Sequence, residues 1–138
     1  MTTITLKGRE IPLLYTVYEM KQIQEDMGPL GDLYYMIMGT TRENPEDREG
    51  FGTPKHLDAL AKLVRILGNA GLEEAGENPD LTEKKILRAI KPGDFADLVM
   101  ACAKAVTEGV KSEIPEEKGD KPVDVTLEEI NKKKERDG

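Results

Sequence analysis

The stretch TPKHLDALAKLVRIL, residues 53–67, decides the fold. Thr53 is a good helix N-cap residue, and Pro54 suits the first helical turn, where its missing N–H is no loss. Apolar side chains then recur every three or four residues and cover a broad face of the predicted helix, formed by Leu57, Leu60, Leu63, Val64, Ile66 and Leu67. We expect this helix to lie at the centre of the protein and to end at Gly68 and Gly71.

A β-hairpin is predicted before it, at residues 4–15. The sequence ITLKGREIPLLY alternates apolar and polar residues on either side of a polar turn that contains Gly8. Pro12 cannot donate to a sheet ladder, so the second strand should have an unpaired edge near it. We expect the apolar side chains of this hairpin to exceed what a small helical body can cover, which would make the hairpin a surface for another chain.

A capping box marks the helix that follows the hairpin. Thr16 can cap the helix while Glu19, three residues later, reaches back to the cap. Gly28 and Pro29 end this helix. A short apolar segment at residues 30–38 comes next, followed by a polar loop at 39–52.

Two more helices complete the predicted body. Thr82 is a plain cap for a short helix that runs to Ile90, because Lys85 stands where a full capping box has Glu. Asp94 is placed to cap a last helix with apolar residues at helical spacing: Phe95, Leu98, Val99, Cys102, Val106 and Val110. The predicted fold is therefore mainly α with an N-terminal β-hairpin (α+β), a small helical body of about five helices and a charged C-terminal tail.

The chain divides into a single helical domain at residues 3–111 and a tail at 112–138. Nine acidic and six basic side chains fall among the 27 residues of the tail. Such a segment buries too little apolar area to offset its ordering entropy, so we expect a flexible tail. A capping box at Thr126 and Glu129 favours a short helix within it, at residues 127–136.

Charge and composition exclude several classes of function. The 138 residues carry 20 basic and 27 acidic side chains, a net charge of −7, which disfavours binding to nucleic acid or to an anionic membrane. Cys102 is the only cysteine and His56 the only histidine, so one chain can form neither a disulfide nor a Cys/His zinc site. A lone cysteine and the absence of an apolar leader indicate a cytoplasmic protein.

No residue is predicted to be catalytic, to bind a cofactor or to hold a metal. Cys102 falls on the apolar face of its helix, where burial makes a thiol inert, and His56 is expected to be a half-exposed residue of a first helical turn. Adjacent carboxylates point about 100° apart on a helix and indicate solvated surface; they occur at Glu73-Glu74, Glu116-Glu117 and Glu128-Glu129. A metal-dependent hydrolase that uses carboxylates alone is kept as an alternative.

Binding to another protein is the function that the residues favour. Methionine fills irregular cores but also suits surfaces that adapt to a partner, and four of the six methionines lie close together around Gly28. The predicted partner-binding residues are Leu13, Tyr15, Met20, Met27, Met36 and Met38. We also expect self-association, through the hairpin or the first helix.

The order of four motifs resembles a known family. They are the hairpin with its internal Gly8, the Gly-Pro-Leu-Gly turn at residues 28–31, the segment ILGNAGL at 66–72, and Leu-Thr-Glu at 81–83, which opens a short helix before a long last one. In this order the chain resembles, over residues 3–111, the tail assembly chaperones of long-tailed, siphovirus-like phages and prophages of Gram-positive bacteria.

The resemblance implies a non-enzymatic protein of the host cytoplasm that leaves before the virion is complete. Proteins of that family bind and solubilise the tape measure protein and recruit tail tube subunits, and many also occur in a longer, frameshifted form. Members have no agreed catalytic residues to carry over. The residues alone leave a second interpretation open, a small acidic adaptor whose partner is a globular protein.

Overall fold

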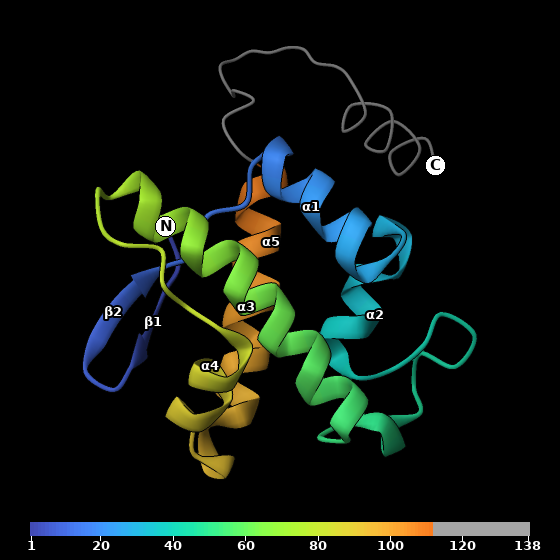
Figure 1. Ribbon diagram of the computed structural model, residues 1–138. Coiled ribbons are helices and arrows are strands. Elements are labelled where there is room, and N and C mark those ends of the chain that lie inside the picture. The colour runs from blue at the N-terminus through green and yellow to red at the C-terminus, as the bar shows by residue number, and fades with distance from the viewer. Residues whose placement is uncertain (112–138) are drawn as a thin grey trace.

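The computed structural model describes residues 1–111, which form an N-terminal hairpin followed by five α-helices (Figure 1). The strands are β1 (Thr3–Leu6) and β2 (Arg9–Pro12), and the helices are α1 (Val17–Met27), α2 (Leu33–Met38), α3 (Pro54–Glu74), α4 (Glu83–Ala89) and α5 (Phe95–Lys111). Short 3-10 turns occupy Leu30–Asp32, Arg48–Gly50 and Pro92–Asp94. The predicted fold class is confirmed. The tail at 112–138, with the short helix predicted at 127–136, lies outside the described residues.

α3 is the central element, as predicted. It crosses the molecule in front of α5 and packs against α1, α2, α4, α5 and β2 (Figure 1). Leu60, Leu63, Val64 and Leu67 of this helix are completely buried. Burying one such side chain contributes about 1.5–3 kcal/mol, so this helix carries a large share of the apolar stabilisation.

The prediction that Gly68 and Gly71 end this helix is wrong, since α3 continues to Glu74. Both glycines lie where other segments come too close for a side chain. A Cβ on Gly71 would lie 1.9 Å from the carbonyl oxygen of Pro12, and a Cβ on Gly68 would lie 2.7 Å from Cδ1 of Leu81. The two glycines therefore let the hairpin and the segment before α4 pack directly on the helix backbone.

The hairpin is paired in antiparallel register, with Ile4 opposite Ile11. Lys7 and Gly8 form its turn and both have positive φ, at 50° and 80°, as a two-residue hairpin turn requires. The exposed fractions of its apolar side chains are small, at 9% for Ile4, 5% for Leu6, 0% for Ile11 and 2% for Leu13. The expectation that the body would leave these side chains uncovered is therefore wrong: α3 and α5 both pack on the hairpin.

Polar contacts fasten both ends of the hairpin to the helical body. Arg9 donates to the carboxylate of Asp80 at 2.9 Å, and the backbone N–H and hydroxyl of Thr2 donate to Glu108 at 3.0 and 2.8 Å. These hydrogen bonds lower the pKa of the Asp80 and Glu108 carboxyl groups below their usual range. The backbone N–H of Leu14 also donates to the carbonyl of Leu67 in α3, at 3.0 Å.

The predicted helix starts are confirmed at Thr16, Thr53 and Thr82 and corrected at Asp94. The buried side chain of Glu19 accepts hydrogen bonds from the backbone N–H of Thr16, at 2.9 Å, and from its hydroxyl. Thr82 accepts from the N–H of Lys85 at 3.2 Å, as a plain cap does. Asp94 was expected to cap α5, but it belongs to the 3-10 turn Pro92–Asp94, which continues directly into that helix.

Candidate functional site

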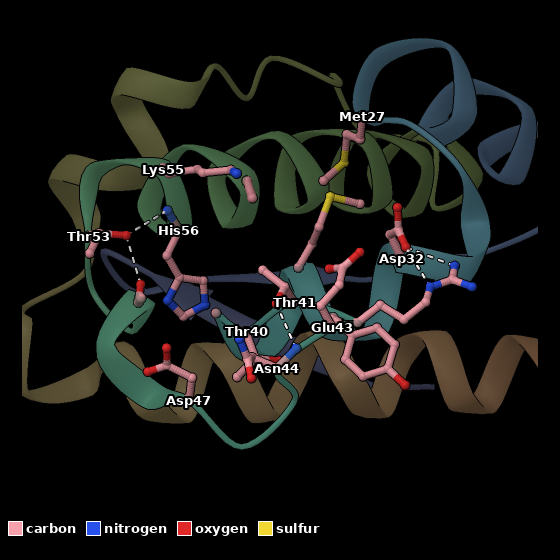
Figure 2. A pocket seen from close by; sticks show the side chains of 16 residues that line it. Met27, Asp32, Thr40, Thr41, Glu43, Asn44, Asp47, Thr53, Lys55 and His56 are labelled. Atoms are coloured by element: carbon pink, nitrogen blue, oxygen red, sulfur yellow. Dashed lines mark hydrogen bonds and ion pairs between the residues drawn. The ribbon is translucent and has the colours of Figure 1, made fainter.

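A groove of about 650 Å³ lies beside α2, the first turns of α3 and the loop between them (Figure 2). Its lining combines side chains from the end of α1, from α2, from the polar loop and from the start of α3: Met27, Asp32, Tyr35, Met36, Gly39, Thr40, Thr41, Arg42, Glu43, Asn44, Asp47, Gly50, Thr53, Lys55, His56 and Ala59. A cavity of this size suits a small molecule or a few side chains of a protein partner.

The groove has apolar walls and a polar rim. Met27, Met36 and Tyr35 supply the large apolar surfaces, and all three are partly buried. On the rim, Arg42 donates to Asp32 through Nε and Nη2, at 3.0 and 2.8 Å, which ties the loop to the start of α2. Such a lining fits an apolar side chain whose surroundings are polar.

Local hydrogen bonds give the 39–52 loop a defined path along the groove. Thr41 accepts from the N–H of Asn44 at 3.0 Å, and Asp47 accepts from the N–H of Glu49 at 3.0 Å. The hydroxyl of Thr53 donates to the carbonyl of Gly50 at 2.7 Å (Figure 2). These are the short side-chain-to-backbone bonds by which Thr and Asp shape turns.

His56 holds the end of this loop in place through hydrogen bonds to the backbone. It is buried, so the prediction of a half-exposed residue is wrong. Its exposed fraction is 3%. Nδ1 accepts from the N–H of Gly52 at 2.9 Å, and Nε2 lies 2.7 Å from the carbonyl oxygen of Ile37, to which it donates as the neutral tautomer. Phe51 and Phe95 pack edge-on against the ring. Both ring nitrogens thus have a structural role, and neither is available as a base.

The other reactive side chain is also enclosed. Cys102 is completely buried, and this burial raises the pKa of its thiol to about 12. Its predicted place on the apolar face of the last helix is confirmed. Within residues 1–111, no three His, Cys, Asp or Glu side chains are arranged to hold a metal ion. Glu73 and Glu74 are exposed, as predicted, and the other two carboxylate pairs lie outside the described residues.

The six residues predicted to bind a partner do not lie on one common surface. Leu13 is 2% exposed and belongs to the core, so it offers a partner no surface. Tyr15 is partly buried, which raises the pKa of its hydroxyl, and Met38 packs partly against the core. Met20 is partly exposed on α1. Only the remaining two, Met27 and Met36, line the groove.

Comparison with known proteins adds no further assignment. No protein-family model, curated protein or solved structure matches this chain. Among the helices of residues 1–111, none combines the length and hydrophobicity that crossing a bilayer would require. The groove and the exposed apolar side chains therefore carry the functional argument.

Two kinds of candidate binding residue are not among those predicted from the sequence. The polar rim of the groove comes from the loop, whose path depends on the buried His56 and so gives no local signal. The exposed apolar side chains could have been found as positions opposite the buried face of each helix. The large ones on the helices are Val17, Tyr18, Tyr34, Leu87, Met100 and Val110, and two more, Met1 and Phe51, lie outside the helices.

Proposed function

We propose that this protein is a non-enzymatic binding protein, a phage tail assembly chaperone that binds and solubilises the tape measure protein and recruits tail tube subunits. The observation that carries the proposal is the groove at Met27 and Met36, with its polar rim. The resemblance in motif order supports the same function. The state of His56 and Cys102 favours binding over catalysis, because both ring nitrogens of His56 are engaged in hydrogen bonds to the backbone and the Cys102 thiol is completely buried.

The groove suits a client that is a long amphipathic helix. Thioether side chains are flexible and polarizable, so Met27 and Met36 can adapt to apolar side chains of different shapes. Tyr35 adds a large, rigid contact surface. The rim groups Asn44 and Lys55 can hydrogen-bond to the polar residues that flank each apolar position of such a helix.

Co-expression with the tape measure protein, the product expected from the adjacent large gene, tests this proposal. The wild-type chain should keep that protein soluble and co-purify with it. Met36→Glu introduces a charge into the groove and should abolish co-purification. Tyr34→Glu is the matched control, because Tyr34 lies on the same helix, is 59% exposed and is not part of the groove lining, so this variant should bind as the wild type does.

A second groove variant is needed because Met36 also packs partly against the core, so that Met36→Glu could lose binding by misfolding. Lys55 is exposed on the rim, so Lys55→Glu should weaken binding without disturbing the core, while Lys84→Glu on α4 serves as its control. Equal binding by both groove variants and both controls would refute the groove as the site. Binding to a folded globular partner, but not to the tape measure protein, would identify a small acidic adaptor instead.

A further inference from the structure

α5 carries a second apolar face, on the side of the helix away from its buried residues. We call it the outer face of α5; it consists of the exposed residues Ala96, Met100, Thr107 and Val110 and of Ala103, which is partly buried and also packs against the core. Met100 and Val110 are 58% and 68% exposed, whereas Leu98, Val99, Cys102 and Ala105 of the same helix are buried. The hydroxyl of Thr107 donates to the carbonyl of Ala103 at 2.8 Å, so it needs no outside partner.

The spacing of the outer face is that of a helix-pairing surface. Its five residues alternate four and three positions apart, which is the pattern of a and d positions in a coiled coil over two heptads. A solitary exposed apolar residue needs no explanation, but a stripe with this period does. The small side chains of Ala96 and Ala103 leave room for a large side chain of another helix to pack beside Met100.

Two unpaired charges flank the outer face on its solvent side. Asp97 and Lys104 follow Ala96 and Ala103 directly, and both are exposed. Among residues 1–111, neither makes an ion pair. Glu108, the acidic residue one turn beyond Lys104, accepts hydrogen bonds from Thr2 and feels the positive charge of Lys104, but the two side chains form no ion pair within residues 1–111, so the Lys104 ammonium can pair with a carboxylate of another chain.

We propose that the outer face of α5 is a self-association surface, on which a second copy of this chain packs its own α5 in the antiparallel direction. Met100 of each copy then lies against Ala103 of the other, large against small. The same alignment brings Asp97 of each copy beside Lys104 of the other, so the two-fold symmetry forms two ion pairs.

The positions of Asp97 and Lys104 favour a second copy of this chain as the partner and favour the antiparallel direction. Parallel pairing would place Met100 on Met100, and it would set Asp97 and Lys104 beside Val99 and Val106, which leaves both charges unpaired. Antiparallel pairing satisfies both at once, which makes the surface complementary to itself. A single helix face is smaller than a standard interface, so we expect a weak dimer.

Analytical ultracentrifugation of the full chain, from about 10 µM to about 1 mM, tests the proposal, since a weak interface dissociates within this range. The wild type should pass from monomer to dimer. Met100→Lys should raise the dimer dissociation constant at least about tenfold, because it introduces a charge into the interface. Val17→Lys is the matched control: Val17 is 74% exposed but lies on α1, so its substitution should change nothing.

Charge reversal tests the antiparallel alignment. Either single variant, Asp97→Lys or Lys104→Asp, replaces both ion pairs of the dimer by pairs of like charge. Each should raise the dimer dissociation constant about tenfold. The double variant Asp97→Lys/Lys104→Asp restores opposite charges across the interface and should recover most of the lost affinity. Thermal melts at low concentration check that every variant folds.

Three results would overturn the proposal. The first is a monomer at all concentrations. The second is a dimer that Val17→Lys disrupts and Met100→Lys does not, which would place the interface on α1. The third is a double variant whose dimer is as weak as the dimers of the two single variants, which would show that the helices do not pair in the antiparallel direction.

Discussion

Gly71 marks the closest approach of β2 to α3, and Gly71→Ala tests whether this contact holds the hairpin in place. The new Cβ would lie 1.9 Å from the carbonyl oxygen of Pro12 and 2.6 Å from its carbonyl carbon. Both are backbone atoms, so no side-chain rotation relieves the overlap. The hairpin would have to move away from the helix by about 1 Å to reach the shortest separation, 3.0 Å, that real Cβ atoms tolerate.

The expected loss of stability follows from the contacts that such a movement disturbs. Overpacking costs about 1–3 kcal/mol. Loss of the hydrogen bond from Leu14 to Leu67 costs about 0.5–1.5 kcal/mol. Alanine is favoured over glycine within a helix by about 1 kcal/mol, which offsets part of this cost. We expect the free energy of unfolding to fall by about 2 kcal/mol, equivalent to about 10 °C in Tm for a domain of this size.

Urea unfolding followed by far-UV circular dichroism measures this loss. Gly93→Ala is the control, because nothing lies within 4 Å of a Cβ at that position, so its stability should stay within about 0.5 kcal/mol of the wild type. Gly68→Ala should fall between the two, since the atom nearest to its Cβ is the mobile end of the Leu81 side chain. If Gly71→Ala were as stable as Gly93→Ala, the close contact would not constrain the hairpin and the reasoning would be refuted.

Three further predictions concern buried and tethered side chains. His56→Ala should destabilise the protein by about 2–4 kcal/mol, because it leaves buried backbone groups without partners and removes packed ring surface; an equilibrium denaturation curve close to that of the wild type would contradict this. Cys102 should react with a thiol reagent such as DTNB only at the rate of unfolding, because its buried thiol has a pKa of about 12; rapid labelling of the native protein would show that it is accessible. Since the folded state lowers the pKa of Glu108, its carboxylate contributes stability at neutral pH that is lost as the pH falls through the lowered pKa. Between about pH 5 and about pH 3, the Tm of the wild type should therefore fall more steeply than that of Glu108→Gln, and parallel profiles would contradict this assignment.

The features that could be predicted from sequence are those determined by neighbours along the chain. The capping box at Thr16, the cap at Thr82 and the apolar period of residues 53–67 each depend on residues within one or two helical turns, and each is confirmed. The hairpin is predictable for the same reason, since the alternation of apolar and polar residues and the glycine in the turn are local signals, and the pairing of β1 with β2 confirms it.

The features that could not be predicted depend on contacts between distant segments. Gly71 looks like a helix terminator until Pro12, far away in sequence, is placed against it. His56 looks half-exposed in the sequence until the 39–52 loop folds over it and the carbonyl oxygen of Ile37 accepts a hydrogen bond from its Nε2. The groove also depends on how elements pack, because its lining comes from four consecutive elements within residues 27–59 that fold against one another. Periodicity describes the face of one element and gives no information on which element covers it.

The attachment of the hairpin also sets an order of events during synthesis. The hairpin leaves the ribosome before the helices that bury it: α3 supplies Gly71, on which β2 packs, and Glu108 near the end of α5 accepts the hydrogen bonds of Thr2. Thr2 and Glu108 are 106 positions apart, so they can form their hydrogen bonds only when nearly all of residues 1–111 have left the ribosome. Ile11 of β2 stays open to solvent until α3 has emerged, and Ile4 and Leu6 of β1 until α5 has emerged, so the nascent chain exposes apolar hairpin surface and is prone to aggregation until α5 is complete.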